Sequence, residues 1–224
     1  MEAKSVLLKL KKFSNPKNVA GMTRFGIQGK KMLGVSMPEL RELGKEIGKD
    51  SKLSQELWET GIHEARILAG IIAEPKIFTE KQMDRWIKDF DSWDVCDRVC
   101  LNLFWQLPPA CEKCVEWSSR EREFEKRAGF ALMAVLAVKD KKIKNEQFEI
   151  FFPIIIKASD DERNFVRKAV NWALRQIGKR NAVLNKKAIE VAKKILKKES
   201  KTAKWIANDA IRELTGNAIQ TRLK

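Results

Sequence analysis

The first candidate catalytic residues lie in the segment that starts at Ser92, where apolar residues recur with the period of a helix. This period places Trp93 and Asp97 one turn apart on one face of a helix. The rest of that face is apolar, and a buried carboxylate is costly unless a cation or a hydrogen-bond donor meets it. Two interpretations stay open: an internal salt bridge with Arg127 or Arg175, or a carboxylate held beside an aromatic ring to meet a cation. The face consists of Trp93, Cys96, Asp97, Cys100, Leu101 and Phe104.

A second candidate lies in segment 162–179, where Trp172 falls between an apolar side and a basic side formed by Lys168, Arg175 and Lys179. Such a tryptophan can stack on a base or a sugar while the cations hold phosphates. The alternative is a tryptophan at the edge of the core, flanked by lysines that extend to water. The preceding helix repeats the basic strip, which favours a shared basic groove. The equivalent residues there are Lys126 and Arg127.

Four cysteines fall within one short stretch, so a metal site must be considered. Cys96 and Cys100 lie on the apolar face, where cysteine packs as a small hydrophobe. Only Cys111 and Cys114 have ligand-like spacing. We expect no metal and no cofactor, although a site at these cysteines stays open, and no disulfides in a reducing compartment. The single histidine, His63, is expected to be a surface or capping residue.

The charge of the chain is strongly positive and unevenly distributed. The formal net charge is +15, and residues 151–224 alone hold 18 Lys/Arg and 7 Asp/Glu. A surface of this kind favours a polyanion, because each neutralised phosphate releases counterions; a merely solvated lysine-rich surface is the alternative. Residues 1–10 lack the apolar core of a signal peptide, and no run approaches the roughly 20 apolar residues of a membrane span. We therefore expect a cytoplasmic protein without a membrane partner.

The elements that must position these residues are helices, because almost every segment has helical periodicity. Ser36 and Glu39 predict a capping box, with Pro38 in the first turn. The acidic residues 160–162 are expected to begin a helix, whose dipole they suit. The clearest helical segments are 63–74, 92–107, 122–139, 145–158, 162–179, 182–198 and 202–214.

The helices also repeat. Ala169 lies 41 positions after Ala128, and Ala207 lies 38 positions after Ala169. A spacing near 40 residues is typical of HEAT-type helix pairs, which stack into a curved array with a concave surface. We predict an all-α, HEAT-like helical-repeat solenoid, an α-α superhelix with a concave basic groove, as a single domain over 1–224. An irregular helical bundle with chance similarity is the alternative.

Four stretches of the sequence, given at the end of this paragraph, resemble the AlkD-like family of DNA glycosylases, the HEAT-like alkylation-repair enzymes. The stretches occur in the family's order and span most of the chain, so their combination is more specific than any one of them. The matching segments are Ser92-Trp93-Asp94-Val95-Cys96-Asp97, Lys126-Arg127-Ala128, Phe165 to Arg175 and, more weakly, Met22 to Arg41.

The resemblance implies a catalytic set of Asp97 with the two indoles of Trp93 and Trp172. It implies contacts from Arg127 and Arg175 to the DNA backbone, besides the basic Lys168 and Lys179 noted above. Phe25 corresponds to an aromatic residue that completes the family's site. The family often has tyrosine at this position, and this chain has no tyrosine. The ring of Phe25 can still stack on a ligand, but a contact through a tyrosine hydroxyl is lost.

The implied reaction suits these residue types. An N3- or N7-alkylated purine carries a positive charge, which indole faces attract. A carboxylate can stabilise the sugar cation and orient the attacking water. The resemblance also implies that the lesion need not enter a deep pocket.

Three functions remain in competition. The first is a monofunctional DNA glycosylase, a monomer that acts on alkylated double-stranded DNA. The second is a non-catalytic relative that binds damaged or branched DNA, and the third is a scaffold that binds an acidic protein. Trp93, Asp97 and Trp172 separate the first from the other two.

Overall fold

The computed structural model describes residues 1–27, 29 and 31–223, and all secondary structure in that part of the chain is helical. The chain divides into two compact units, Met1–Leu107 and Pro108–Lys224. A single domain over the whole chain stays a prediction. No helix within the described ranges has the length and apolar character needed to cross a bilayer.

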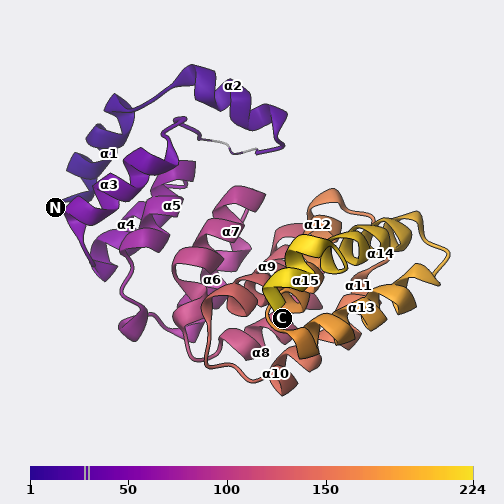
Figure 1. The fold of residues 1–224 in the computed structure, drawn as a ribbon. Coiled ribbons are helices and arrows are strands. Elements are labelled where there is room, and N and C mark those ends of the chain that lie inside the picture. Colours follow the sequence, from indigo (N-terminus) through magenta and orange to yellow (C-terminus); the bar gives the residue numbers. More distant parts are fainter. Residues whose placement is uncertain (28, 30, 224) are drawn as a thin grey trace. The chain divides into compact units, whose positions relative to one another are not determined.

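The first unit contains short helices with clear start signals. Ser36 accepts a hydrogen bond from the Glu39 backbone N–H while the Glu39 carboxylate accepts one from the Ser36 N–H, which confirms the predicted capping box. The elements, seen in Figure 1, are α1 (Ala3–Lys12), α2 (Pro16–Arg24), α3 (Met37–Ile47), α4 (Ser51–Glu59), α5 (His63–Ile72), the 3-10 turn η1 (Pro75–Ile77), α6 (Glu80–Lys88), α7 (Trp93–Asn102) and η2 (Phe104–Gln106).

Aromatic rings form the core between α4 and α6. Trp58 and Trp86 stack with ring centroids 3.8 Å apart and planes 3° from parallel. Both are fully buried, and their indole N–H groups donate to Asp89 and Gln55. Because each buried indole keeps a polar partner, the stack adds apolar burial without an unsatisfied donor. Phe78, Phe90 and Phe104 pack around it.

The second unit contains the longer helices. Their bounds are α8 (Ala110–Ser118), α9 (Glu123–Lys139), α10 (Asn145–Glu149), α11 (Phe151–Ala158), α12 (Asn164–Gly178), α13 (Ala182–Leu196), α14 (Lys201–Leu214) and α15 (Asn217–Leu223). Figure 1 shows α12 beside α14, and α12 also packs on α9. The predicted start of a helix at 160–162 is wrong, because α12 begins at Asn164 after the N-cap Arg163 and Asp161 binds cations instead.

Small residues let the helices of this unit approach closely. Ala128, Ala169 and Ala207, the repeated alanines of the sequence, are fully buried on α9, α12 and α14. At Gly129 a Cβ atom would lie 2.5 Å from the Ser118 backbone nitrogen, so only glycine fits between α8 and α9. The repeated alanines therefore lie where neighbouring helices of this unit pack against each other.

Candidate functional site

Helix α7 places Trp93 and Asp97 as the sequence predicts. Ser92, in an extended conformation, caps the helix by accepting a hydrogen bond from the Asp94 N–H at 3.3 Å. Trp93 and Asp97 follow one turn apart, and both are partly exposed, whereas Cys96 is buried. Asp97 therefore lies at the border of the apolar face rather than sealed within it.

Trp93 is fixed by a residue far away in the sequence. Its indole Nε1–H donates to the carbonyl oxygen of Phe25 at 3.2 Å. Phe25 lies directly after α2, and 76% of its surface is exposed. An exposed phenylalanine beside a tryptophan provides aromatic surface that a planar ligand can use. Three predicted site residues, Phe25, Trp93 and Asp97, thus belong to one unit.

The adjoining face of α7, formed by Asp94 and Arg98, carries a charged network that the sequence did not reveal. The Nε2 atom of His63 lies 3.2 Å from Asp94 Oδ2, and Arg98 Nε donates to Asp94 Oδ1 at 3.3 Å. Burial alone would raise the pKa of Asp94, but the hydrogen bond and charge of His63, together with Arg98, outweigh it and lower that pKa. His63 is 3% exposed, so its assignment as a surface residue is wrong: its imidazole pairs with a carboxylate 31 positions away.

The predicted residues of the second unit lie on α9 and α12. Trp172 is partly exposed and Lys168 is exposed. The amide of Gln176, turned so that its oxygen faces its neighbours, accepts hydrogen bonds from Trp172 Nε1 at 3.1 Å and Lys179 Nζ at 3.3 Å. The indole and the cations of this strip are therefore held together along one helix.

Arg127, on α9, is only 6% exposed, and its Nη1 donates to the Phe165 carbonyl at 2.6 Å. This bond ties α9 to the first turn of α12. A buried guanidinium with such a contact has a structural function in addition to any contact with DNA.

Arg175 and Lys179 share an acidic partner. Both pair with Glu213 on α14, and Arg175 also lies 3.5 Å from Asp209. Burial opposes ionisation of Glu213, but Lys179 and Arg175 outweigh it and lower its pKa. Part of the positive charge of this strip is thus neutralised within the unit. Lys168 is exposed and forms no ion pair among the described residues, which leaves its charge more available to a polyanion.

Sequence reasoning missed an exposed aromatic residue on α14. Trp205 is 42% exposed, and the Arg167 guanidinium lies 5.5 Å from the centre of its ring. Its position directly after Lys204, in a basic segment that also holds Lys201, was the signal that could have identified it. Such a cation–indole pair is suited to contact with nucleic acid.

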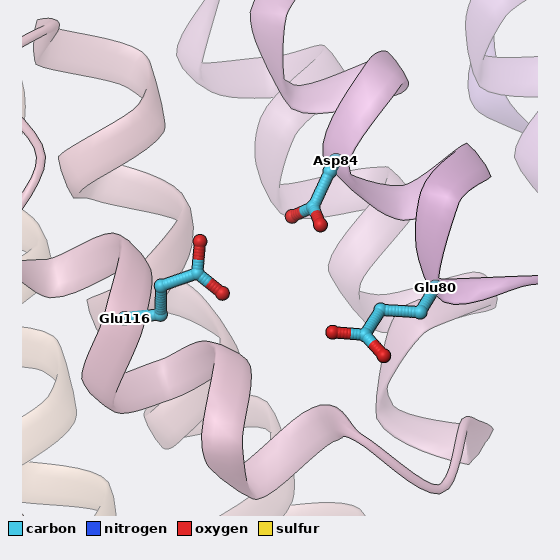
Figure 2. Close-up of side chains that lie close together, drawn as sticks. All are labelled: Glu80, Asp84 and Glu116. Atoms are coloured by element: carbon cyan, nitrogen blue, oxygen red, sulfur yellow. The ribbon is translucent and has the colours of Figure 1, made fainter.

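Cysteines and acidic side chains are the groups of the described residues that come into question as metal ligands. The four cysteines form no disulfide with one another, and burial raises the pKa of the Cys111 and Cys114 thiols. Glu80 and Asp84 lie one turn apart on α6, as Figure 2 shows. Glu116, on α8, is held by ion pairs within its own unit. Exposed acidic groups of this kind are common without a metal.

The overall architecture is similar to that of a solved structure described as a new family of proteins related to the HEAT-like repeat DNA glycosylases with affinity for branched DNA structures. That chain is 22% identical, the match covers 95% of each chain, and the TM-score is 0.78. A designed armadillo repeat protein in complex with the peptide (KR)4 matches less well, at 18% identity, with 83% and 79% of the two chains covered and a TM-score of 0.38. The predicted all-α, HEAT-like repeat fold is confirmed.

The fold thus defines a HEAT-like helical-repeat protein. The family model described as "DNA alkylation repair enzyme" matches residues 6–214. The chain belongs to the DNA alkylation repair enzyme family, and the resemblance inferred from its motifs is confirmed. No curated protein matches the sequence.

Proposed function

We propose that this protein is a monofunctional DNA glycosylase that hydrolyses the N-glycosidic bond of cationic N3- or N7-alkylated purines in double-stranded DNA. The observation that carries the proposal is the pair on α7: Trp93 and Asp97 lie one turn apart, both partly exposed, with the indole fixed by the Phe25 carbonyl. A fixed aromatic ring next to a carboxylate is suited to a cationic nucleoside.

In the proposed reaction, the bond between C1′ of the deoxyribose and the purine nitrogen breaks, and its electron pair cancels the positive charge of the base. Asp97 stabilises the cationic character that develops on the sugar and orients a water molecule. The water oxygen then forms a bond to C1′, and its proton passes to the carboxylate or to solvent. The products are the free alkylated base and an abasic site.

The assignments in the second unit are further parts of this proposal. Trp172 supplies a second indole, and Lys168 contacts phosphates. Arg127, Arg175 and Lys179 contribute to DNA binding in addition to their contacts within the unit.

The test is release of methylated base from DNA treated with a methylating agent. We expect release by the wild type and a loss of about 100-fold or more in Asp97→Asn, since electrostatic stabilisation of a transition state has this size. The matched control is Asp91→Asn, which changes an exposed carboxylate just before α7. Circular dichroism must show that both variants are folded. An Asp97→Asn variant as active as the wild type would remove the carboxylate from the mechanism.

The second candidate function is non-catalytic binding of damaged or branched DNA. It is favoured by the description of the similar solved structure, which names affinity for branched DNA. A wild-type protein that releases no base, but binds a four-way junction more tightly than a duplex of equal length, would establish this function instead.

A further inference from the structure

A cavity of about 410 Å³ lies within the second unit, where residues from the ends of α9, α12 and α15 meet. Small-molecule sites in proteins span roughly 300–1,000 Å³, so this volume suits one small ligand. The lining is basic and contains no carboxylate side chain among the residues that the structure describes. Its cationic members are Lys141, Lys179, Arg180 and Arg222.

Arg180 follows α12 and is held by backbone carbonyls instead of a carboxylate. Its Nη1 donates to the carbonyl oxygens of Ala137 at 3.1 Å and Asp140 at 2.6 Å. Its Nη2 donates to the Ile143 carbonyl at 2.8 Å. Burial lowers the pKa of Arg180, and the charge of Asp140 opposes this only in part. A partly buried cation in this state is stabilised by an anion brought next to it.

The carbonyl oxygens at the ends of α9 and α12 do not repel an anion here, because cations already bind them. The free carbonyls at the C-terminal end of a helix carry partial negative charge. Arg180 covers those at the end of α9 and in the turn after it. Arg222 Nη2 donates to the carbonyl of Lys179, directly after α12, at 2.7 Å. The two guanidinium groups therefore present positive charge at both helix ends.

Two carboxylates interact with cations of the lining from outside the cavity. Asp140 Oδ1 accepts hydrogen bonds from two backbone N–H groups of the turn that follows it, at 2.8 and 3.2 Å. Glu213 is shared between Lys179 and Arg175. Of the four cations of the lining, only Lys179 is therefore neutralised by an ion pair within this unit.

Lys141 and Arg222 are exposed, and neither forms an ion pair within the described part of the chain. Together with Arg180 they leave the cavity with a clear excess of positive charge, which favours an anion. Gln176 also lines the cavity, and its turned amide accepts the hydrogen bond from Trp172 Nε1. The cavity thus adjoins the strip of α12 that carries the indole.

We propose that this cavity binds a phosphate group of a nucleotide, held by Lys141, Arg180 and Arg222. Guanidinium and ammonium groups donate charge-assisted hydrogen bonds to phosphate oxygens. Val138 and Leu223 line the cavity as well and provide apolar contact for the attached sugar or base. A free nucleotide and a DNA strand offer the same phosphate chemistry, and binding measurements distinguish these two sources. The inference does not depend on the glycosylase activity.

The first experiment measures binding of deoxyguanosine monophosphate and of deoxyguanosine, which lacks the phosphate, by titration calorimetry. We expect the wild type to bind the monophosphate about tenfold or more tightly. The double variant Lys141→Gln/Arg222→Gln should lose about tenfold or more of this affinity. Lys193→Gln/Lys194→Gln is the matched control, because it removes the same charge from exposed positions of α13 outside the cavity. It should bind like the wild type.

A carboxylate introduced at the cavity provides a second variant. Val138 lines the cavity and is 44% exposed, so Val138→Glu adds a negative charge there without disturbing the core. We expect its affinity for the monophosphate to fall to that for the nucleoside. Val183→Glu is the control, since Val183 is 54% exposed on α13 and does not line the cavity. Circular dichroism must show that all variants are folded.

The second experiment measures binding of a DNA duplex at several salt concentrations. Each contacted phosphate contributes about 0.9 to the steepness of the plot of log affinity against log salt concentration. If the cavity holds a phosphate of DNA, Lys141→Gln/Arg222→Gln should reduce this steepness by about 1, and the α13 control should not. Unchanged steepness together with lost binding of the monophosphate identifies a free nucleotide as the ligand.

The proposal is overturned if the cavity variants behave like their α13 controls in both experiments. It is also overturned if the wild type binds monophosphate and nucleoside equally and the duplex plot is unchanged in the double variant. Base release from methylated DNA is measured on the same preparations. A wild type that binds phosphate through the cavity but releases no base refutes the glycosylase function alone. Base release with binding that is independent of the cavity refutes the phosphate site alone.

Discussion

Asp161 lies just before α12 and connects α9 to the start of α12. Its carboxylate accepts hydrogen bonds from Lys126 Nζ on α9 and from Arg163 Nε, each at 2.9 Å. Burial raises the pKa of this carboxyl, but the bonds from Arg163 and Lys126 outweigh burial and lower it from 3.8 to about 2. We predict that Asp161→Asn destabilises the protein at neutral pH, because the amide loses the charge that both cations face.

The size of the effect follows from the pKa difference. One pKa unit corresponds to about 1.4 kcal/mol, so the shift from 3.8 to about 2 sets an upper limit of about 2.5 kcal/mol, and solvent screening reduces it to about 1–2 kcal/mol. A carboxyl with a lowered pKa stabilises the fold above its unfolded pKa, and this stabilisation disappears as pH falls through its folded pKa. The difference between wild type and Asp161→Asn should therefore be full above about pH 5, fall to about a third of that size near pH 2.5 and vanish only below pH 2.

The assay is urea unfolding followed by circular dichroism at several pH values between 7 and 2.5. The neighbouring Asp160→Asn is the control, since Asp160 is more exposed and its one ion pair among the described residues is with Lys198. Its effect should stay within about 0.5 kcal/mol. If Asp161→Asn behaves like this control at neutral pH, or if its deficit persists in acid, the electrostatic reasoning is refuted.

Two further predictions concern the packing of each unit. Gly129→Ala should lower the free energy of unfolding by about 1–3 kcal/mol, because the new methyl group meets the Ser118 backbone, which cannot yield as a side chain can. Urea unfolding measures it, and an unchanged midpoint would contradict the close approach of α8 and α9. Glu64→Gln should cost about 1–3 kcal/mol, since Leu33 and Gly34 donate to different carboxylate oxygens and the NH2 group that replaces one of them cannot accept. We expect faster hydrogen exchange at the Gly34 amide in this variant. Unchanged protection of that amide would show that the Glu64 carboxylate does not hold the backbone at Leu33 and Gly34.

The sequence predicted the helices well because their signals are local. The repeated alanines at Ala128, Ala169 and Ala207 and the capping box at Ser36 each depend on residues within one or two turns or one repeat. Helical periodicity alone also placed Trp93 and Asp97 on one face. All these features follow from spacing along the chain.

The contacts that fix the side chains could not be predicted in this way. The pairing of His63 with Asp94, and the bond from Trp93 to the Phe25 carbonyl, join residues 31 and 68 positions apart. Periodicity contains no information about such partners, so it predicts only a surface or capping residue at His63. The burial of Arg127 was missed for the same reason, because its acceptor is a carbonyl on another helix.

The parallel indoles of Trp58 and Trp86 also have an optical consequence. Two identical chromophores at 3.8 Å couple strongly, and the chain contains no tyrosine whose absorption would overlap theirs. The pair should produce a paired positive and negative band in circular dichroism that disappears when α4 and α6 separate. The first unit thus contains its own spectroscopic reporter, and comparing its loss with the far-ultraviolet signal shows whether the two units unfold together or in turn.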